Sequence, residues 1–351
     1  MNSTSNQAAP SLQRPPLRPK RKDEALAGTG VRAFLVRNLE AYALLGLLVV
    51  VAIFFSVYSK TADTFPTTAN IQALIGSQAV VAVVALAALV PLVTNAWDLS
   101  VGAVAGLSAI YSASAMASGT PLVLALLLGL AIGMVIGLAN ALIVSRGGVN
   151  PVITTLGMSV IVAGIINQKT SGTAITGGLP VALTEFGSGT WFGIPRTAFA
   201  LAAVALLVYY VLDHTPVGRY LYALGSNPNG ARLVGLRTKL LLSSTFVAAG
   251  LLAAAAGFLQ VARAGGADPR VGETFTLPAL AAAFLSAASI KPGRYNVGGT
   301  LVAIFFLATL NSGLNLAGAQ PYVSSYVNGA ALIVGVGLAA YLGRRRTGQL
   351  Y

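Results

Sequence analysis

The sequence predicts an all-α integral membrane protein. Of its 351 residues, 56% are hydrophobic and only 9% are charged, whereas soluble domains carry about 25% charged residues. The mean hydropathy of +0.77 agrees, and the apolar residues gather in long blocks separated by short polar segments. A soluble globule of this composition could not cover its surface with polar groups. Most soluble enzymes and nucleic-acid-binding proteins are therefore excluded, in spite of a net charge of +13.

The apolar blocks define the predicted transmembrane helices. A helix needs about 20 apolar residues to cross the hydrocarbon core, and about ten blocks approach that length. They cover residues 41–59, 70–92, 99–118, 121–145, 151–168, 197–212, 239–262, 276–290, 297–316 and 322–342. The sequence therefore predicts about ten transmembrane helices.

The basic residues predict the orientation of these helices. If the N-terminus is cytosolic, the basic residues on the outer side are Lys60, Lys169, Arg196, Arg263 and Arg270. All the others fall in the cytosolic tails and loops, where Lys and Arg are normally in excess. We therefore expect the N-terminus and the C-terminus to be cytosolic.

The two ends of the chain differ from its apolar middle. Residues 1–38 are polar, basic and rich in proline, so they are predicted to form a disordered cytosolic tail that buries no core. A contact of this tail with lipid headgroups or a partner is the alternative. The transmembrane domain is predicted to cover residues 39–346, and residues 347–351 form a C-terminal tail.

Small residues recur at helical spacing in two of the predicted spans. One stripe is formed by Gly129, Gly133, Gly137 and Ala141, and another by Ala331, Gly335, Ala339 and Gly343. In lipid such stripes let two helix backbones approach closely. They predict helix packing and carry no chemistry.

Several kinds of chemistry have no residues to support them. The chain has no cysteine and a single histidine, His214, so a metal or cofactor site is not expected. No Gly-Lys pair occurs, which excludes the common phosphate-binding loop. The sequence also shows no acid–base pair of the kind that would indicate an enzyme. If ATP drives transport, the ATPase with its ATP and Mg²⁺ must be another chain. Acidic residues are scarce in the spans, which argues against a secondary sugar carrier or facilitator, but this alternative stays open because broken helices also bind ions through carbonyls.

The polar segment 213–238 carries the clearest local signals. Gly225 is expected to close a first short helix, and Asn227 to cap a second one that has Pro228 at its first position. Gly235 is expected to end this second helix, predicted over 228–234. A rigid cytosolic helix of this kind suits docking to a soluble partner. The alternative is an interfacial helix whose arginines lie at lipid headgroups.

Sequence motifs then indicate a family. The segment Gly218-Arg-x-x-Tyr-Ala-x-Gly-x-Asn227, followed by Ala231-Arg-Leu-x-Gly235, resembles the cytosolic segment of ribose-type monosaccharide ABC importer permeases. Further stretches that resemble this family, in the same order along the chain, are Asp98-Leu-Ser-Val-Gly102, Asn150-Pro-x-Ile-x-Thr-Leu-Gly157, Thr176-Gly-Gly178, Gly299-Thr300 and Asn311-x-Gly-Leu-Asn-Leu-x-Gly318. The resemblance covers roughly residues 40–346.

The resemblance implies a specific assembly in the inner or plasma membrane of a prokaryote. Two permease subunits form the pore, a separate cytosolic ATPase drives it, and an extracytoplasmic binding protein delivers a sugar. The residues expected to couple this chain to the ATPase are Gly218, Arg219, Tyr222, Gly225, Asn227, Ala231, Arg232 and Gly235. The segments near 170–195 and 264–274 are expected to face the binding protein.

Five polar or aromatic residues are candidates for the translocation path. Asn95, Trp97 and Asp98 lie in the break between the second and third spans. Asp98 is either a ligand or a cap for the following helix, and Trp97 either stacks on a sugar ring or lies at the membrane interface. Asn311 and Asn315 are four residues apart on one helix and bind either sugar hydroxyls or neighbouring helices.

The motifs also depart from the family pattern. Thr94-Asn-Ala-Trp97 replaces the usual T-G-G-I, Leu285-Ser-Ala-Ala-Ser289 replaces L-G-G-T-S, and Pro292-Gly293 replaces a pair of glycines. These departures leave the expected fold unchanged but prevent assignment to one particular sugar.

Overall fold

The computed structural model describes residues 31–347, and it describes side chains for residues 41–341. The helices are α1 Val31–Val57, α2 Thr68–Leu92, α3 Val101–Ala117, α4 Leu122–Ser145, α5 Pro151–Thr170, α6 Val181–Ser188, α7 Arg196–Tyr209, α8 Pro216–Ser226, α9 Pro228–Leu233, α10 Thr238–Ala264, α11 Val271–Leu285, α12 Val297–Leu316 and α13 Pro321–Thr347. A short hairpin pairs β1 Thr190–Trp191 with β2 Ile194–Pro195.

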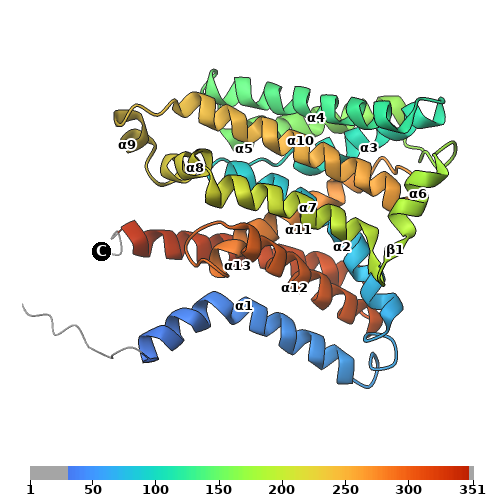
Figure 1. Cartoon of the computed structure of the whole chain (residues 1–351), viewed down its shortest axis with the longest axis horizontal. Coiled ribbons are helices and arrows are strands. Elements are labelled where there is room, and N and C mark those ends of the chain that lie inside the picture. The colour runs from blue at the N-terminus through green and yellow to red at the C-terminus, as the bar shows by residue number, and fades with distance from the viewer. Residues whose placement is uncertain (1–30, 348–351) are drawn as a thin grey trace, which may run out of the picture. The chain divides into compact units, whose positions relative to one another are not determined.

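The part of the chain from Glu40 onward forms one compact helical unit. Its long helices run side by side, as Figure 1 shows, with α8 and α9 at one end of the bundle and α6 and β1 at the other. The C-terminal end of α13 lies at the same end as α8 and α9 (Figure 1). The backbone thus brings the polar segment 213–238 and the end of the last helix to one side.

The described helices agree closely with the predicted spans. Eight of them are long and apolar enough to cross a membrane. The predicted spans 41–59 and 99–118 correspond to two shorter apolar helical stretches, Ala41–Val57 and Val101–Ala117. The all-α membrane fold is therefore confirmed, whereas the number of ten spans and the orientation of the termini stay predictions.

Some boundaries differ from the predicted ones. α1 begins at Val31, so residues 31–38, which composition assigned to the tail, continue the first helix. Residues 1–30 and 348–351, which make up the rest of the two predicted tails, lie outside the described residues. A π-helical turn, Tyr210–His214, extends α7, and a 3-10 turn, Ser286–Ala288, extends α11. α6 and the hairpin were not expected, because their apolar residues are interrupted by Gly187, Gly189 and Gly193 and do not form the long apolar run of a span.

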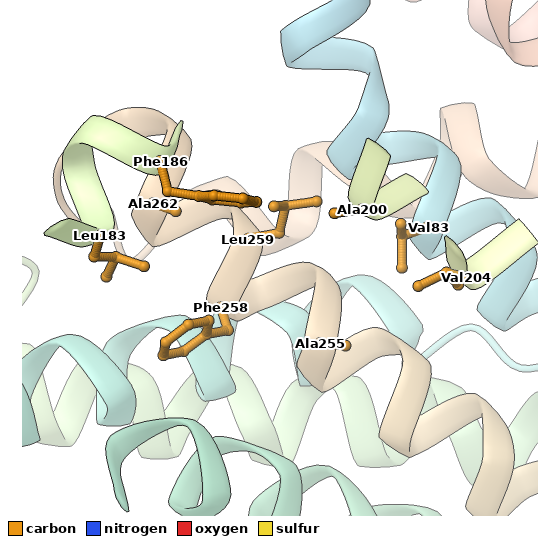
Figure 2. A pocket seen from close by; sticks show the side chains of 9 residues that line it. All are labelled: Val83, Leu183, Phe186, Ala200, Val204, Ala255, Phe258, Leu259 and Ala262. Atoms are coloured by element: carbon orange, nitrogen blue, oxygen red, sulfur yellow. The ribbon is translucent and has the colours of Figure 1, made fainter. Parts of the chain in front are cut away.

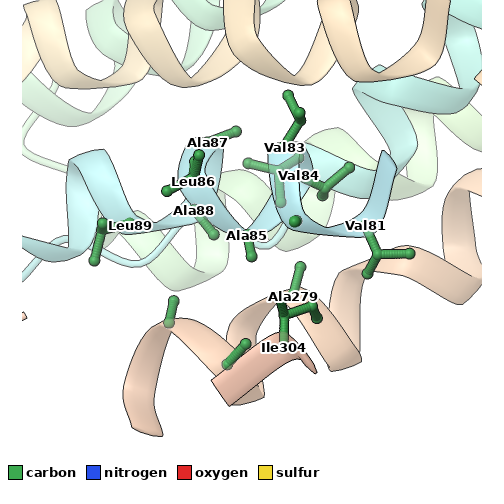
Figure 3. Packing of buried hydrophobic residues seen from close by; sticks show 14 of the residues in the cluster. Val81, Val83, Val84, Ala85, Leu86, Ala87, Ala88, Leu89, Ala279 and Ile304 are labelled. Carbon is green, nitrogen blue, oxygen red and sulfur yellow. The ribbon is translucent and has the colours of Figure 1, made fainter. Parts of the chain in front are cut away.

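Helix α2 occupies the centre of the bundle. Every residue from Ala79 to Leu92 is buried, as expected for a helix that is hydrophobic on all sides and enclosed by protein. On one side α2 packs against α7 and α10, and a pocket there is lined by Val83 together with residues of α6, α7 and α10 (Figure 2). On another side it packs against α11 and α12, where Val81 and Val84 lie near Ala279 and Ile304 (Figure 3).

Glycines bring α4 and α10 into close contact. A Cβ atom added to Gly133 would collide with the carbonyl oxygen of Gly250, and one added to Gly137 would collide with that of Phe246. The predicted stripe on α4 is thus a packing surface for α10. In the second stripe, Gly335 of α13 lies against Phe284 and Leu285 of α11. Both contacts are of the small-residue type that stabilises helix pairs in lipid.

Replacing Gly133 by Ala is expected to destabilise the protein by about 1–3 kcal/mol, because the added methyl group overpacks the contact with α10. The apparent melting temperature of the purified protein in detergent measures the effect. Gly164→Ala on α5 is the matched control, since a Cβ there meets nothing within 4 Å. Equal melting temperatures of the two variants would contradict this account of the α4–α10 contact.

Candidate functional site

The segment between α7 and α10 is built by local capping signals. The Thr215 side chain accepts a hydrogen bond from the Gly218 N–H at 3.3 Å and so caps α8. The Asn227 side chain accepts one from the Gly230 N–H at 2.9 Å and caps α9, which has Pro228 at its first position. Gly235 has a φ of +83°, a conformation that glycine adopts without strain. The helix predicted over 228–234 is therefore present as Pro228–Leu233.

The prediction for Gly225 is wrong in its detail. α8 does not close at Gly225 but continues through Ser226 and ends where Asn227 becomes extended, with a φ of −152°. Gly225 is needed for packing instead, because a Cβ there would collide with the carbonyl oxygen of Val93. Likewise, a Cβ added to Gly218 would collide with the carbonyl oxygen of Leu212.

The outward-facing part of the segment combines cations with apolar side chains. Leu221, Leu224 and Ala231 are buried and hold α8 and α9 against the bundle. Leu233 and Val234 are 87% and 77% exposed. Arg219 and Arg232 are also exposed. We call the surface formed by Arg232, Leu233 and Val234 the α9 surface. An exposed apolar patch with a charged rim is typical of a contact surface for another molecule.

An ion-pair cluster fixes this segment to the connection between α11 and α12. The Asp213 carboxylate lies 2.8 Å from Lys291 Nζ and 3.4 Å from an Arg294 guanidinium nitrogen. The Asp213 side chain is only 9% exposed, so this pair is shielded more than an ordinary surface salt bridge. The pairing joins residues far apart in the sequence and no local pattern predicted it.

Two tyrosines extend the same cluster. The Arg294 guanidinium lies 3.5 Å from the centre of the Tyr222 ring, and the Tyr222 hydroxyl donates a hydrogen bond to the Tyr295 carbonyl oxygen at 2.7 Å. Burial raises the pKa of Tyr222, opposed by the charge of Arg294, and raises the pKa of Tyr295 to about 12. Tyr222 therefore keeps the proton that it donates, and α8 is held from its inner side.

The break between α2 and α3 provides a second attachment. Asn95 has a φ of +58°, which is unusual for a residue other than glycine. Its side-chain amide donates a hydrogen bond of 2.7 Å to the Gly225 carbonyl oxygen. Next to it, the buried Asp98 carboxylate accepts hydrogen bonds from the N–H and O–H of Ser100, at 2.9 and 2.6 Å. Both hydrogen bonds come from Ser100, the residue before α3, and not from an N–H of α3 itself, so the choice between a ligand and a cap for Asp98 stays a prediction.

The remaining path candidates do not converge on one place. Trp97 is half-buried and packs edge-on against Phe284, with 4.8 Å between ring centroids. The side-chain amide of Asn311 donates to Asn328 of α13 at 3.3 Å, which is a contact with a neighbouring helix, and Asn315 is exposed. Among the described side chains no hydrogen bond joins these two asparagines to Asn95, Trp97 or Asp98. A role of these five residues in translocation stays a prediction.

At the opposite end of the bundle two loops are joined. Ile175 and Ala267 exchange two backbone hydrogen bonds of 2.9 Å each. The bridge joins the segments 170–195 and 264–274, and their contact with the binding protein stays a prediction. No cluster of three or more potential metal-ligating side chains exists among the residues that the structure describes.

Comparison with known proteins decides the family. A family model described as a branched-chain amino acid transport system permease component matches residues 70–336. The chain belongs to this permease family. The permease is 35% identical over 293 residues to the ribose import permease protein RbsC of Bacillus subtilis (strain 168), covering 83% of this chain and 90% of that protein.

Further relatives of the permease are named for the import of ribose or D-allose. It is 32% identical over 304 residues to the ribose import permease protein RbsC of Escherichia coli (strain K12), covering 85% and 92% of the two chains. It is 30% identical over 293 residues to the D-allose transport system permease protein AlsC of the same strain, covering 83% and 89%. No solved structure gives a significant match. The permease is thus a multi-pass inner-membrane subunit of the ribose-type ABC importer family and not an enzyme.

Replacing Asp213 by Asn is expected to loosen α8, because it removes the charge that pairs with Lys291 and Arg294. Hydrogen–deuterium exchange of residues 216–226 should rise several-fold, as a hydrogen bond to a charged group stabilises by about 1.5–3 kcal/mol before screening. Asp268→Asn is the matched control, since Asp268 is exposed and lies at the other end of the bundle. Unchanged exchange in Asp213→Asn would show that the ion pair does not hold α8.

Proposed function

We propose that this permease imports a monosaccharide or a related polyol, driven by a separate cytosolic ATPase. An extracytoplasmic binding protein delivers the sugar, and a second copy of this chain or a homologue completes the pore. ATP and Mg²⁺ bind to the ATPase, and the permease itself carries no cofactor. Relatives named for ribose and D-allose import support the substrate class.

The proposed topology has ten spans with both termini in the cytosol. Eight long apolar helices and two shorter apolar helical stretches support this number. The excess of basic residues in the loops at the end of α8 and α9 supports the orientation. The segment 213–238 then lies in the cytosol, and the joined loops around Ile175 and Ala267 face the binding protein.

The observation that carries the proposal is the attachment of the α9 surface. α9 exposes this surface outward, and α8 and α9 are tied inward to two different connections between membrane helices. One tie is the ion pair of Asp213 with Lys291, and the other is the hydrogen bond of Asn95 to Gly225. A segment that only rested on lipid headgroups would not need such ties. A segment that transmits a force from a partner to the membrane helices would need them.

The residues of the predicted coupling set then divide by function. Arg219 and Arg232 are exposed and available for contacts with acidic residues of the ATPase. Tyr222 anchors α8. The other members, Gly218, Gly225, Asn227, Ala231 and Gly235, shape the backbone that presents the two arginines.

Replacing Arg232 by Glu is expected to weaken binding of the ATPase at least about ten-fold, because placing like charges against each other at an interface costs several kcal/mol. Co-purification of the ATPase with the tagged permease from membranes measures it. Arg270→Glu, the same change at an exposed site on the opposite end, should leave co-purification unaltered. If the Arg232→Glu variant inserts normally into the membrane and still retains the full amount of ATPase, the proposal that α9 docks to the ATPase is wrong.

Purified permease alone in liposomes is expected not to accumulate ribose or any other sugar, because the chain contains no phosphate-binding loop and few intramembrane acids. Addition of the ATPase, the binding protein and ATP should start accumulation. Uptake of radiolabelled sugar is the measurement. Accumulation by the unaccompanied chain would instead favour the self-sufficient secondary carrier.

A further inference from the structure

A groove between α7 and α10 has no polar lining. Both helices pack on α2, which forms the floor with Val83, and α6 covers one end with Leu183 and Phe186. The groove contains a cavity of about 210 Å³ (Figure 2). Ala200 and Val204 of α7 lie on one side, and Phe258 and Leu259 of α10 on the other. An apolar cavity of this size does not hold ordered water, and no sugar hydroxyl would find a hydrogen-bond partner in it.

Two arginines lie directly above this cavity, toward the end of the bundle opposite α8 and α9. Arg196 is four residues before Ala200, and Arg263 is four residues after Leu259, so each lies one turn outward on the face that lines the cavity. The Arg263 guanidinium crosses to α2, where its Nε is 3.0 Å from the position of a Cβ on Gly76. Gly76 is itself two turns outward of Val83. The three helices thus place both cations at the mouth of one apolar groove.

Neither cation is neutralised by the protein. No carboxylate among the described side chains forms an ion pair with Arg196 or Arg263. The Nε atoms of both are buried without a hydrogen-bond partner. Arg196 donates one hydrogen bond, to the Glu185 backbone carbonyl at 3.3 Å, and lies 5.6 Å from the Trp191 ring. Unpaired guanidinium groups at a partly buried site favour an anion, and phosphate matches their geometry.

The adjacent hairpin lies beside the first turns of α2. The Gly193 carbonyl accepts a hydrogen bond of 2.9 Å from Gln72, a residue in the second turn of α2. The hairpin tip is therefore beside the ends of the membrane helices and does not project beyond them. Phe192 is fully exposed, and Trp191 and Ile194 are about half exposed. Exposed aromatic residues beside arginine at this depth are typical of contact with lipid.

We propose that this groove binds an anionic phospholipid, with an acyl chain in the cavity between α7 and α10 and the phosphate at Arg196 and Arg263. A single molecule with an apolar tail and an anionic head satisfies both the unfilled cavity and the unpaired cations. A soluble protein that docked from outside could neutralise the arginines but would leave the cavity below them empty. The proposal does not depend on the imported substrate or on the ATPase.

Tryptophan fluorescence gives a direct test, because the chain has only two tryptophans. In the full chain with Trp97→Phe, Trp191 is the only tryptophan, and its ring packs on Phe186 at the cavity, with 6.3 Å between centroids. The protein is reconstituted in phosphatidylcholine bilayers, and brominated phosphatidylglycerol or brominated phosphatidylcholine is added as the quencher. We expect phosphatidylglycerol to bind near Trp191 at least roughly five-fold more strongly, since each basic residue near a membrane surface contributes about 1 kcal/mol.

Three variants separate the parts of the site. In the double variant Arg196→Gln and Arg263→Gln, the ratio of phosphatidylglycerol binding to phosphatidylcholine binding near Trp191 should fall close to one. Arg270→Gln, an exposed outer arginine away from the cavity, should leave it unchanged. Ala200→Phe should fill the cavity and reduce quenching by both lipids. If a variant does not fold, native mass spectrometry of the unaltered chain still reports whether phosphatidylglycerol is retained in preference to phosphatidylcholine.

Two results would overturn the proposal. One is equal quenching by the two lipids, with no retained phosphatidylglycerol, in the chain with both arginines. The other is an unchanged lipid preference in the double variant together with weaker binding of the extracytoplasmic binding protein. In that case the arginines would serve the protein partner.

Discussion

Close contact between helix backbones is the constraint on which this structure depends. Lipid tails are as apolar as the side chains of the bundle, so helices in a membrane gain little from hydrophobic burial alone. Here the part of α2 from Ala79 to Leu92 is enclosed by protein, and the surrounding helices reach one another through glycines such as Gly133 and Gly250. Without those glycines the helices would stand further apart, and the polar connections at the ends of the bundle would lose the distances that hold them together.

Two polar contacts at the ends of the helices join connections that are distant in the sequence. Asp213 meets Lys291 and Arg294 at the connection of α11 with α12, and Asn95 meets Gly225 at the break between α2 and α3. Each contact spans a boundary between separate helices, so a displacement of α8 acts on α2, α3, α11 and α12 at once. This arrangement links one polar segment at the end of the bundle to four of its helices.

Hydropathy alone predicted the long helices, because a span must be apolar along its whole length and that property is local. Capping residues were similarly readable, and Asn227-Pro228 marked the start of α9 correctly. The sequence did not predict the partners of Asp213, since nothing in a local pattern relates it to residues at 291 and 294. It also misassigned Gly225 as a helix end, because close approach to Val93 and a C-terminal cap both require glycine. The contact of Trp97 with Phe284 could not be predicted either, because Phe284 comes from a helix that is distant in the sequence.

The contact of Gly225 with Val93 has a consequence for exchanging parts between transporters. The carbonyl oxygen of Val93 occupies the space that any side chain at 225 would need, and Asn95 supplies the hydrogen bond beside it. The two segments therefore form one complementary contact, although they are more than a hundred residues apart. A chimera that transplants the loop 213–238 into another scaffold would inherit only one half, and the matching residues around 93–95 would have to travel with it.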